Sequence, residues 1–469
     1  MRYEKLIKKG DEISITIDSL AYGGKGVGKT NNFVLFVKGA LPSEKVVARV
    51  VKKRSGYAEA VKVKTAQESP HFISPSCEHF PTCGGCSLQH LDYQEQLEQK
   101  RQQVIDLFRR IGGIQNVPLK EVVPAEDIYH YRNKMEFTFS NRRWTLPDEE
   151  KGVDASFALG LHIPNRFDKV LDINTCWIQK PIANSILQRV KEMANELCLK
   201  PYDIIKHKGF LRNLVIRVGG RTGDVMVNIV TSREEPELLL PIVEMLVTEF
   251  PQVTSIVNNI TKRKAGVAFG EREVVLFGTP YIRDKIGEHI FEISANSFFQ
   301  TNTIQAENVY KIARELANFS GDDVVYDLYS GTGSLSIFMA GLAKQVYGFE
   351  LIQSAVEDAV RNAVNNGAYN CQFYHANLDK FFRVTPILKK IEKPDVILID
   401  PPRAGMHPKL VKDVIQMSPQ KIVYISCNPS TQARDVLVMS KGNYKLDQLA
   451  IVDMFPHTPY IETVALIRK

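Results

Sequence analysis

A cysteine stands where a hydrophobic, strand-like run ends, since Lys421-Ile-Val-Tyr-Ile-Ser426 leads directly into Cys427. The following Asn428-Pro429 interrupts regular strand pairing, so the thiol is presented at an open strand end. Two carboxylates, Asp400 and Glu462, also border strand-like runs. A thiolate is a nucleophile, and a nearby carboxylate can accept or donate a proton. The three side chains form a catalytic group if the topology brings them to one sheet edge, whereas an isolated cysteine is usually a small buried apolar residue.

A glycine-rich turn follows another strand-like run, in Asp327-Leu-Tyr-Ser-Gly331-Thr-Gly333. A strand, a Gly-x-Gly turn and a helix allow the backbone to approach a nucleoside cofactor closely. The turn lacks the third glycine of a dinucleotide-binding motif, and the next strand ends in Glu350, whose carboxylate can accept both ribose hydroxyls. Together with Asn377 and Asp400 after the next two strands, the pattern predicts a site for S-adenosylmethionine (SAM) rather than four ordinary strand-end turns.

A thiol that faces a methyl donor either accepts the methyl group or attacks the substrate. A pyrimidine gains a nucleophilic C5 carbon when a thiolate adds to C6, and a base must then remove the C5 proton before the thiolate can leave. Cys427, Asp400 and Glu462 supply the thiolate, a polar group for the pyrimidine edge and a base. The thiol would react as a thiolate, so we expect the pKa of Cys427 to lie below the usual thiol value.

The elements that must position these side chains alternate regularly from about residue 290. Strands separated by helices predict a doubly wound parallel sheet, in which ligands bind outside the carboxyl ends of the strands. The last two strands lie close together in sequence, so we expect one of them to run antiparallel. The predicted strands are 323–328, 344–350, 371–375, 395–400, 421–426, 447–453 and 462–468.

The N-terminal segment is basic and rich in short strands. Residues 1–64 contain 14 Lys or Arg and 6 Asp or Glu, in a chain with a net charge of +7. Short strands separated by glycine-rich turns, notably 22–28, predict a small OB-like β-barrel. Basic barrels of this kind bind single-stranded nucleic acid, so we expect RNA as the partner; a solvated lysine-rich surface is the alternative. No signal peptide or membrane-spanning run is recognisable, which favours a cytoplasmic protein. We expect neither membrane association nor an obligate protein partner.

Three of the seven cysteines lie within ten residues, as Cys77-x5-Cys83-x2-Cys86. Cys176 is the best candidate for a fourth ligand. The spacing does not distinguish zinc from an iron–sulfur cluster, and His79 and His90 keep zinc possible. The Cys-x3-Cys-x2-Cys spacing of radical-SAM enzymes is absent, so a structural or RNA-contacting role is favoured over SAM cleavage.

These motifs together strongly resemble those of the bacterial RNA (uracil-5-)-methyltransferases, over nearly the full length of the chain. The matching stretches are Tyr131-Arg-Asn-Lys134, Phe298-Phe-Gln-Thr-Asn302, Asp327-Leu-Tyr-Ser-Gly-Thr-Gly333, Asp400-Pro-Pro-Arg-Ala-Gly405, Ser426-Cys-Asn-Pro-Ser-Thr431 and Asp453-Met-Phe-Pro-His-Thr458 with Glu462. The N-terminal barrel resembles a TRAM domain, which fits the branch that acts on 23S rRNA rather than the tRNA branch.

The resemblance implies an α/β protein of three parts: a TRAM-like barrel (1–67), a mixed α/β domain with the cysteine cluster (68–290) and a Rossmann-like SAM-dependent methyltransferase domain (291–469). It implies that Cys427 is the nucleophile, that Glu462 is the base, and that Cys77, Cys83, Cys86 and Cys176 hold a [4Fe–4S] cluster. The residues that it implies for the SAM and uracil pockets are Gln300, Tyr329, Glu350, Asn377 and Asp400.

Four other functions are alternatives to methylation of a uridine in 23S rRNA. A tRNA uracil-5 methyltransferase would use the same chemistry on another RNA. An RNA cytosine-5 methyltransferase usually has a second cysteine in a Pro-Cys motif after the fourth strand, where this chain has Pro401-Pro402-Arg403. An iron–sulfur redox protein that modifies RNA would depend on its cluster for turnover. A non-catalytic RNA-binding protein would not need Cys427, Asp400 and Glu462 together.

Overall fold

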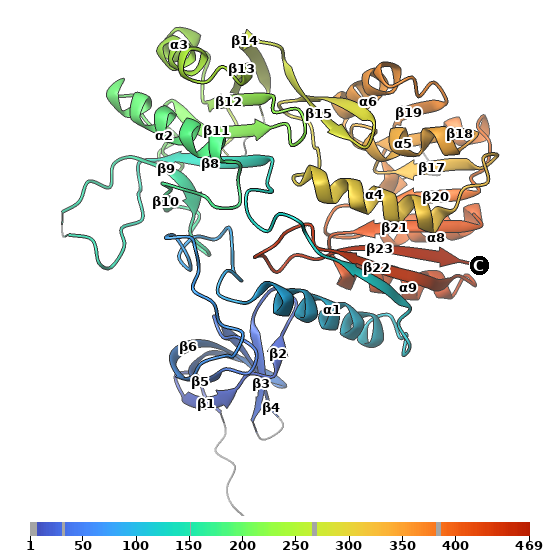
Figure 1. Cartoon of the computed structure of the whole chain (residues 1–469), viewed down its shortest axis with the longest axis horizontal. Helices are drawn as coiled ribbons and strands as arrows, with labels where there is room; N and C mark the ends of the chain where they lie inside the picture. Colours follow the sequence, from blue (N-terminus) through green and yellow to red (C-terminus); the bar gives the residue numbers. More distant parts are fainter. Residues whose placement is uncertain (1–6, 31–32, 151, 265–269, 381–385) are drawn as a thin grey trace, which may run out of the picture.

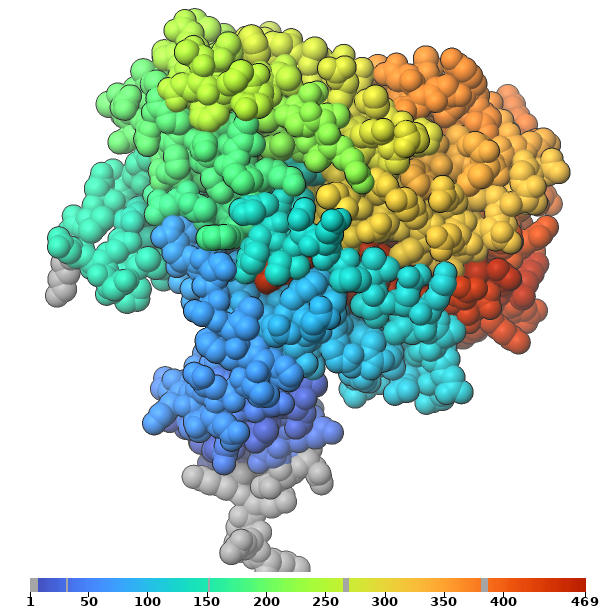
Figure 2. Space-filling model, in the orientation of Figure 1, coloured from blue at the N-terminus to red at the C-terminus, as the bar shows by residue number. Residues whose placement is uncertain are grey.

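The structure is a computed structural model that describes residues 7–30, 33–150, 152–264, 270–380 and 386–469. It contains a small N-terminal barrel, a central sheet with two helices, and a larger C-terminal sheet covered by helices on both faces (Figure 1). In the space-filling view the barrel is a lobe that projects from the rest of the molecule (Figure 2). The α/β class predicted from the sequence is confirmed, whereas the domain limits at residues 67 and 290 stay predictions.

Six strands form the N-terminal barrel, in the order β1-β5-β6-β4-β3-β2. Strand β3 lies close to β1, so the two ends of this order approach each other. A side chain on Gly28 of β3 would lie 2.5 Å from the carbonyl oxygen of Thr16 in β1. Glycine is therefore required at position 28 for close packing inside a strand. The turn predicted at residues 22–28 is shorter than expected, because β3 already begins at Gly26. The strands are β1 (Glu12–Thr16), β2 (Ser19–Leu20), β3 (Gly26–Thr30), β4 (Phe33–Lys38), β5 (Lys45–Lys53) and β6 (Tyr57–Gln67).

The central part is a seven-stranded sheet in which only β12 and β13 pair in parallel. Helices α2 (Pro181–Glu196) and α3 (Leu240–Glu249) pack their apolar residues against it. A hairpin of β15 (Tyr281–Ile286) and β16 (His289–Ser294) follows and joins the core of the C-terminal part. The strands of the central sheet, in their order across it, are β10 (Val170–Asp172), β9 (Ala158–His162), β8 (Lys134–Ser140), β11 (Leu211–Val218), β12 (Val225–Thr231), β13 (Val253–Ile260) and β14 (Arg272–Gly278).

The C-terminal sheet has eight strands, and β23 is the one strand among them that runs antiparallel to its neighbours. Alternate residues of β21 enter two separate apolar cores, with Val423 in one and Ile422 in the other, because strand side chains alternate between faces. The strands in spatial order are β19 (Cys371–His375), β18 (Gln345–Glu350), β17 (Val324–Leu328), β20 (Val396–Ile399), β21 (Lys421–Ser426), β23 (Glu462–Arg468), β22 (Lys445–Val452) and β7 (Leu119–Val123).

Helices cover both faces of this sheet, as the doubly wound prediction requires. The core on one face contains residues of α4 (Thr303–Ala317), α5 (Ser334–Met339) and α6 (Gln353–Asn365). The core on the other contains residues of α1 (Tyr93–Arg110), α8 (Pro408–Met417) and α9 (Pro429–Ser440). Helix α1 and strand β7 thus belong to this sheet although both precede residue 291. Of the helices in the described ranges, none has the length and apolar character needed to cross a bilayer.

Candidate active site

The strand register brings the three predicted catalytic residues to one edge of the sheet. In β20 and β21, Ile399 lies beside Tyr424, so Asp400 emerges next to the end of β21. In the antiparallel pair β21 and β23, Ser426 lies opposite Thr463. The next position of this ladder sets Cys427 opposite Glu462, the first residue of β23.

The turn after Cys427 explains why a thiol stands at this strand end. Asn428 caps helix α9, since its side-chain oxygen accepts a hydrogen bond from the Ser430 amide (3.1 Å). The Asn428 side-chain NH₂ also donates to the carbonyl oxygen of Arg403 (2.9 Å). Pro429 fits the first turn of the helix, where an amide hydrogen is not needed. Cys427 is therefore held between a strand and a helix N-terminus, with the loop after β20 fixed beside it.

Burial, followed by the carboxylates of Glu462 and Asp400, raises the pKa of Cys427 to about 11. The guanidinium of Arg403 acts in the opposite direction. The prediction of a lowered pKa is therefore wrong for the free protein, because burial disfavours the charged thiolate and the two neighbouring acids repel it. The thiol stays protonated until it reacts, and its proton must then pass to a base.

The two carboxyl groups are also shifted toward their neutral forms. Burial raises the pKa of Asp400 to about 7, against a hydrogen bond from the Gln300 side chain (3.2 Å) that lowers it. Burial raises the pKa of Glu462 well above its usual value, and Asp400 adds to this effect while Arg403 opposes it. Carboxyl groups with raised pKa values can exchange protons near neutral pH, as general acids and bases must.

Arg403 received no role from the sequence, although it stands in the Asp-Pro-Pro-Arg motif. Its guanidinium lies 4.1 Å from the centre of the Tyr460 ring. Its positive charge favours the ionised forms of both Cys427 and Glu462. The motif was the signal that could have identified it, since a cation beside a thiol and two carboxyl groups favours their ionised forms.

The predicted cofactor residues lie along the same edge, around the β17–α5 turn. The amide of Gly331 donates to the Glu350 carboxylate (3.1 Å), which ties the turn to the end of β18. A side chain on Gly333 would lie 2.8 Å from the Phe373 ring, so glycine is required there. Tyr329 has a φ of 69°, which turns the chain sharply out of β17.

The other two predicted cofactor residues belong to two more segments. The side-chain oxygen of Asn377 accepts a hydrogen bond from the Asp379 amide (3.0 Å) in the turn after β19. The carbonyl oxygen of Gln300 accepts one from the Asn133 side chain (2.9 Å), which joins the Tyr131-Arg-Asn-Lys134 motif to the site. A role in binding SAM stays a prediction for all of these residues.

The segment that leads into Glu462 is fixed by helix α1. Lys100 and Asp453 form an ion pair of 2.6 Å between side chains that are 2% and 0% exposed. Tyr93 donates a hydrogen bond to the same carboxylate (2.9 Å). Removing one partner of a buried ion pair costs about 3–5 kcal/mol, so residues 453–462 are held firmly. No local pattern points to this pairing, because Lys100 and Asp453 are 353 residues apart in the chain.

The same segment is bonded to the loop of the cysteine cluster. The amides of Ser87 and Leu88, directly after Cys86, both donate to the carbonyl oxygen of His457 at 3.0 Å. The Gln96 side-chain oxygen accepts a hydrogen bond from the His457 amide (2.9 Å). The cysteine loop therefore supports the segment that carries Glu462.

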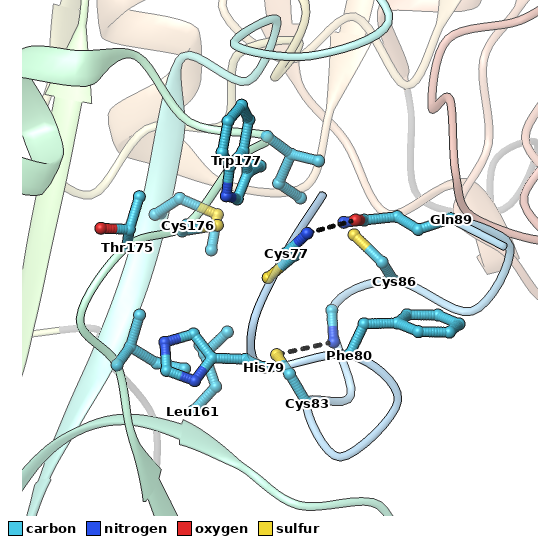
Figure 3. Close-up of a pocket in the computed structure, with 14 residues that line it drawn as sticks. Cys77, His79, Phe80, Cys83, Cys86, Gln89, Leu161, Thr175, Cys176 and Trp177 are labelled. Atoms are coloured by element: carbon cyan, nitrogen blue, oxygen red, sulfur yellow. Dashed lines mark hydrogen bonds between the residues drawn. The ribbon is translucent and has the colours of Figure 1, made fainter. Parts of the chain in front are cut away.

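The four predicted metal ligands line one cavity between the cysteine loop and the central sheet (Figure 3). The residues of this set are Cys77, Cys83, Cys86 and Cys176. His79 also borders the cavity, but its Nε2 accepts a hydrogen bond from the Asn174 amide (3.0 Å). His90 packs on the Phe80 ring, 4.9 Å between centres. Within the described ranges, no group of three or more His, Cys, Asp or Glu side chains is placed to hold a metal ion, so metal binding stays a prediction.

The raised thiol pKa predicts a distinctive pH dependence for alkylation by iodoacetamide. Below a pKa of about 11 the thiolate fraction of Cys427 rises tenfold per pH unit, so its alkylation rate should still be climbing at pH 10. Arg403→Met should slow the reaction, because it removes the positive charge that favours the thiolate. Peptide mass spectrometry can follow Cys427 and the exposed Cys198 together in the same sample. A plateau for Cys427 below pH 8 would contradict this reading of the site.

Comparison with known proteins identifies the family. The family model described as tRNA (Uracil-5-)-methyltransferase matches residues 267–469, and that of the TRAM domain matches residues 7–63. An uncharacterized RNA methyltransferase of Chlorobaculum tepidum is 41% identical and covers 98% of this chain and 97% of its own. Another from Porphyromonas gingivalis is 39% identical over 96% and 98%.

A solved structure covers nearly all of the chain. It is the Pyrococcus abyssi tRNA (uracil-54, C5)-methyltransferase in complex with S-adenosyl-L-homocysteine, with a TM-score of 0.74 and 31% identity over 97% of this chain and 100% of that one. Identity at this level over the full length means common descent of the whole chain, not only of the sheet. The chain therefore belongs to the RNA (uracil-5-)-methyltransferase family.

Proposed function

We propose that this protein methylates C5 of a uridine in 23S rRNA, with SAM as the methyl donor, through a covalent bond between Cys427 and C6 of the uracil. The observation that carries the proposal is the register of β21 and β23, which sets Cys427 opposite Glu462 with Asp400 at the end of the adjacent strand. A nucleophile, a base and a polar group for the pyrimidine edge thus meet beside the predicted cofactor turn.

The reaction assigns one task to each residue. The thiol of Cys427 passes its proton to the carboxylate of Asp400, so the carboxylate of Glu462 stays free to accept the C5 proton later. The thiolate then adds to C6, and the resulting nucleophilic C5 takes a methyl group. SAM supplies that methyl group and leaves as S-adenosylhomocysteine. Glu462 removes the C5 proton, the C5–C6 double bond re-forms, and the thiolate of Cys427 is released.

The RNA target is inferred from the organisation of the chain. The TRAM match and the excess of basic residues in 1–64 support RNA binding by the barrel, which we assign to residues 1–67. A uridine must leave its stack to enter a strand-end pocket, which favours single-stranded or loop RNA. A tRNA is the second candidate, because the family model and the archaeal structure are both named for tRNA (uracil-5) methylation.

Mapping 5-methyluridine in RNA from cells with and without the gene separates these targets. We expect a 5-methyluridine of 23S rRNA to disappear in the deletion strain and to return with the wild-type gene, while tRNA remains methylated. The purified protein should restore the same position in 23S rRNA from the deletion strain. Loss of 5-methyluridine from tRNA alone would contradict the rRNA assignment and favour the second candidate.

We also propose that Cys77, Cys83, Cys86 and Cys176 hold a [4Fe–4S] cluster, with zinc as the lesser alternative. Four thiols border one cavity, and thiolates are the ligands of both groups. The resemblance of the cysteine motif to the family's cluster favours iron–sulfur over zinc. Such a group would fix the loop whose Ser87 and Leu88 amides support His457.

Replacing one cluster cysteine is expected to remove the iron. Protein purified without oxygen should be brown and contain iron, and Cys86→Ser should lose both colour and metal, because a cluster cannot be held securely by three thiolates and a hydroxyl. Metal analysis and visible absorption measure this directly. Cys198→Ser is the matched control, since Cys198 is exposed and lies outside the cavity. Stoichiometric zinc without iron in the anaerobic wild type would overturn the iron–sulfur assignment.

A further inference from the structure

The barrel reaches the predicted nucleophile through one tyrosine. Tyr22 lies in the turn between β2 and β3, and its hydroxyl donates a hydrogen bond to the carbonyl oxygen of Cys427 (3.5 Å). The half-buried Tyr22 ring packs against the apolar core of the C-terminal sheet. A residue of the N-terminal barrel thus contacts the strand end that carries the predicted nucleophile.

The turn that carries Tyr22 is held in place from several sides. The Ala21 amide donates to the carbonyl oxygen of Lys25 (2.8 Å), which closes the turn on itself. The Leu20 amide donates to the Gln99 side chain of α1 (2.7 Å). On the far side, a side chain on Gly24 would lie only 3.3 Å from Pro459. The position of Tyr22 therefore results from a fitted contact between the barrel and the catalytic part.

A small separate core strengthens this contact. It joins leucines of the barrel to leucines of the segment after the cysteine loop, each at most 3% exposed, namely Leu20, Leu41, Leu88 and Leu91. In the space-filling view, a few red atoms of the C-terminal part are visible between the light-blue and cyan segments that follow the barrel in the chain (Figure 2). The barrel is thus packed onto the enzyme at the side where the 453–462 segment lies.

The surroundings of Tyr22 keep its hydroxyl neutral and able to donate. Burial, followed by the nearby Cys427, raises the pKa of Tyr22 to about 12, whereas Arg403 acts in the opposite direction. The charges of Tyr460 and Glu462 act on the same hydroxyl. Tyr22 is therefore within electrostatic range of the nucleophile, the base and the cation of the site.

We infer that Tyr22 is a positioning residue for the reaction at Cys427, supplied by the barrel. Its hydroxyl fixes the Cys427 peptide group at the strand end, and its ring shields the thiol from water on the barrel side. Methyl transfer then depends on the docked barrel for geometry as well as for RNA affinity. This inference rests on the proposed covalent function, which assigns the nucleophile to Cys427.

The test compares Tyr22→Ala and Tyr22→Phe with the wild type in three measurements. These are the rate of covalent adduct formation at saturating RNA that contains 5-fluorouracil, the affinity for that RNA, and the rate of Cys427 alkylation by iodoacetamide without RNA. Tyr22→Ala should slow adduct formation at least tenfold with RNA affinity within twofold, and should speed alkylation at least threefold. Tyr22→Phe should slow adduct formation but leave alkylation unchanged, because it keeps the ring. Tyr369→Ala is the matched control. Tyr369 is 80% exposed and precedes β19, the outermost strand at the other end of the strand order from β7.

Two results would overturn the inference. Adduct formation by Tyr22→Ala at the wild-type rate would mean that the tyrosine does not assist the reaction. A defect that disappears when more RNA is added would mean that Tyr22 only binds RNA. If the wild type itself forms no adduct, the proposed function fails instead. The alkylation measurement then still decides the position of Tyr22, because equal rates in wild type and Tyr22→Ala would contradict shielding of the thiol.

Discussion

Cys427→Ala is expected to abolish methyl transfer, with a loss of at least about 10⁴-fold, because no other group at the strand end can form the bond to C6. SAM binding should be retained, since the predicted cofactor residues Gly331, in the turn after β17, and Glu350, at the end of β18, lie away from the end of β21. Methyl transfer from labelled SAM to RNA measures the loss, and equilibrium binding of SAM measures the retained affinity.

RNA with 5-fluorouracil at the target position gives an independent readout of the same residue. Fluorine at C5 cannot leave as a proton does, so the wild type should remain covalently joined to this RNA in denaturing gels. Cys427→Ala should form no such species, whereas Cys198→Ala, at an exposed cysteine, should behave as the wild type. Methylation by Cys427→Ala at a normal rate would refute the role of nucleophile.

Glu462→Gln is expected to produce the second-largest effect, a fall in turnover of about 10²–10⁴-fold. The variant should still attack C6 and transfer the methyl group, since neither step requires the carboxylate of Glu462 to accept the C5 proton. It should then accumulate a covalent protein–RNA species, because the C5 proton is not removed. Mass spectrometry of that species should show one added methyl group.

The control for this variant is Glu288→Gln, a change of the same kind at a side chain that is 93% exposed in a surface turn. The control should turn over normally without trapped RNA. Normal turnover by Glu462→Gln, again without trapped RNA, would assign proton removal to another residue. Asp400→Asn would then be the next variant to examine, because Asp400 is the other carboxylate beside Cys427.

The sequence predicted the catalytic sheet and its edge well, for a simple physical reason. Strands β20 and β21 are nearly continuous apolar runs bounded by turn residues, so their existence and ends can be read locally. The strand ends then fall on one edge, because a doubly wound sheet puts the carboxyl ends of its parallel strands together. Asp400, Cys427 and Glu462 could therefore be grouped before their contacts were known.

Properties that depend on distant contacts could not be read from the sequence. The pKa of Cys427 is raised and not lowered as predicted, because burial and two acids outweigh Arg403. Tyr22 lies 405 residues from its partner Cys427 in the chain, and nothing near it in the sequence points to that contact. The glycines of β3 were assigned to a turn, because close packing against Thr16 leaves no local signal.

The edge strand β7 has a consequence for how the protein is made. Leu119 pairs with Leu449, so the catalytic sheet is completed by a strand that leaves the ribosome long before its partner. Before residues 445–468 are synthesised, β7 and helix α1 have no partners to pack against, and Lys100 lacks the carboxylate of Asp453. Long-range pairing of this kind is slow and leaves an open strand edge during folding. A fragment that begins at residue 267 would keep that edge of β22 permanently open, so we expect it to aggregate where the whole chain folds.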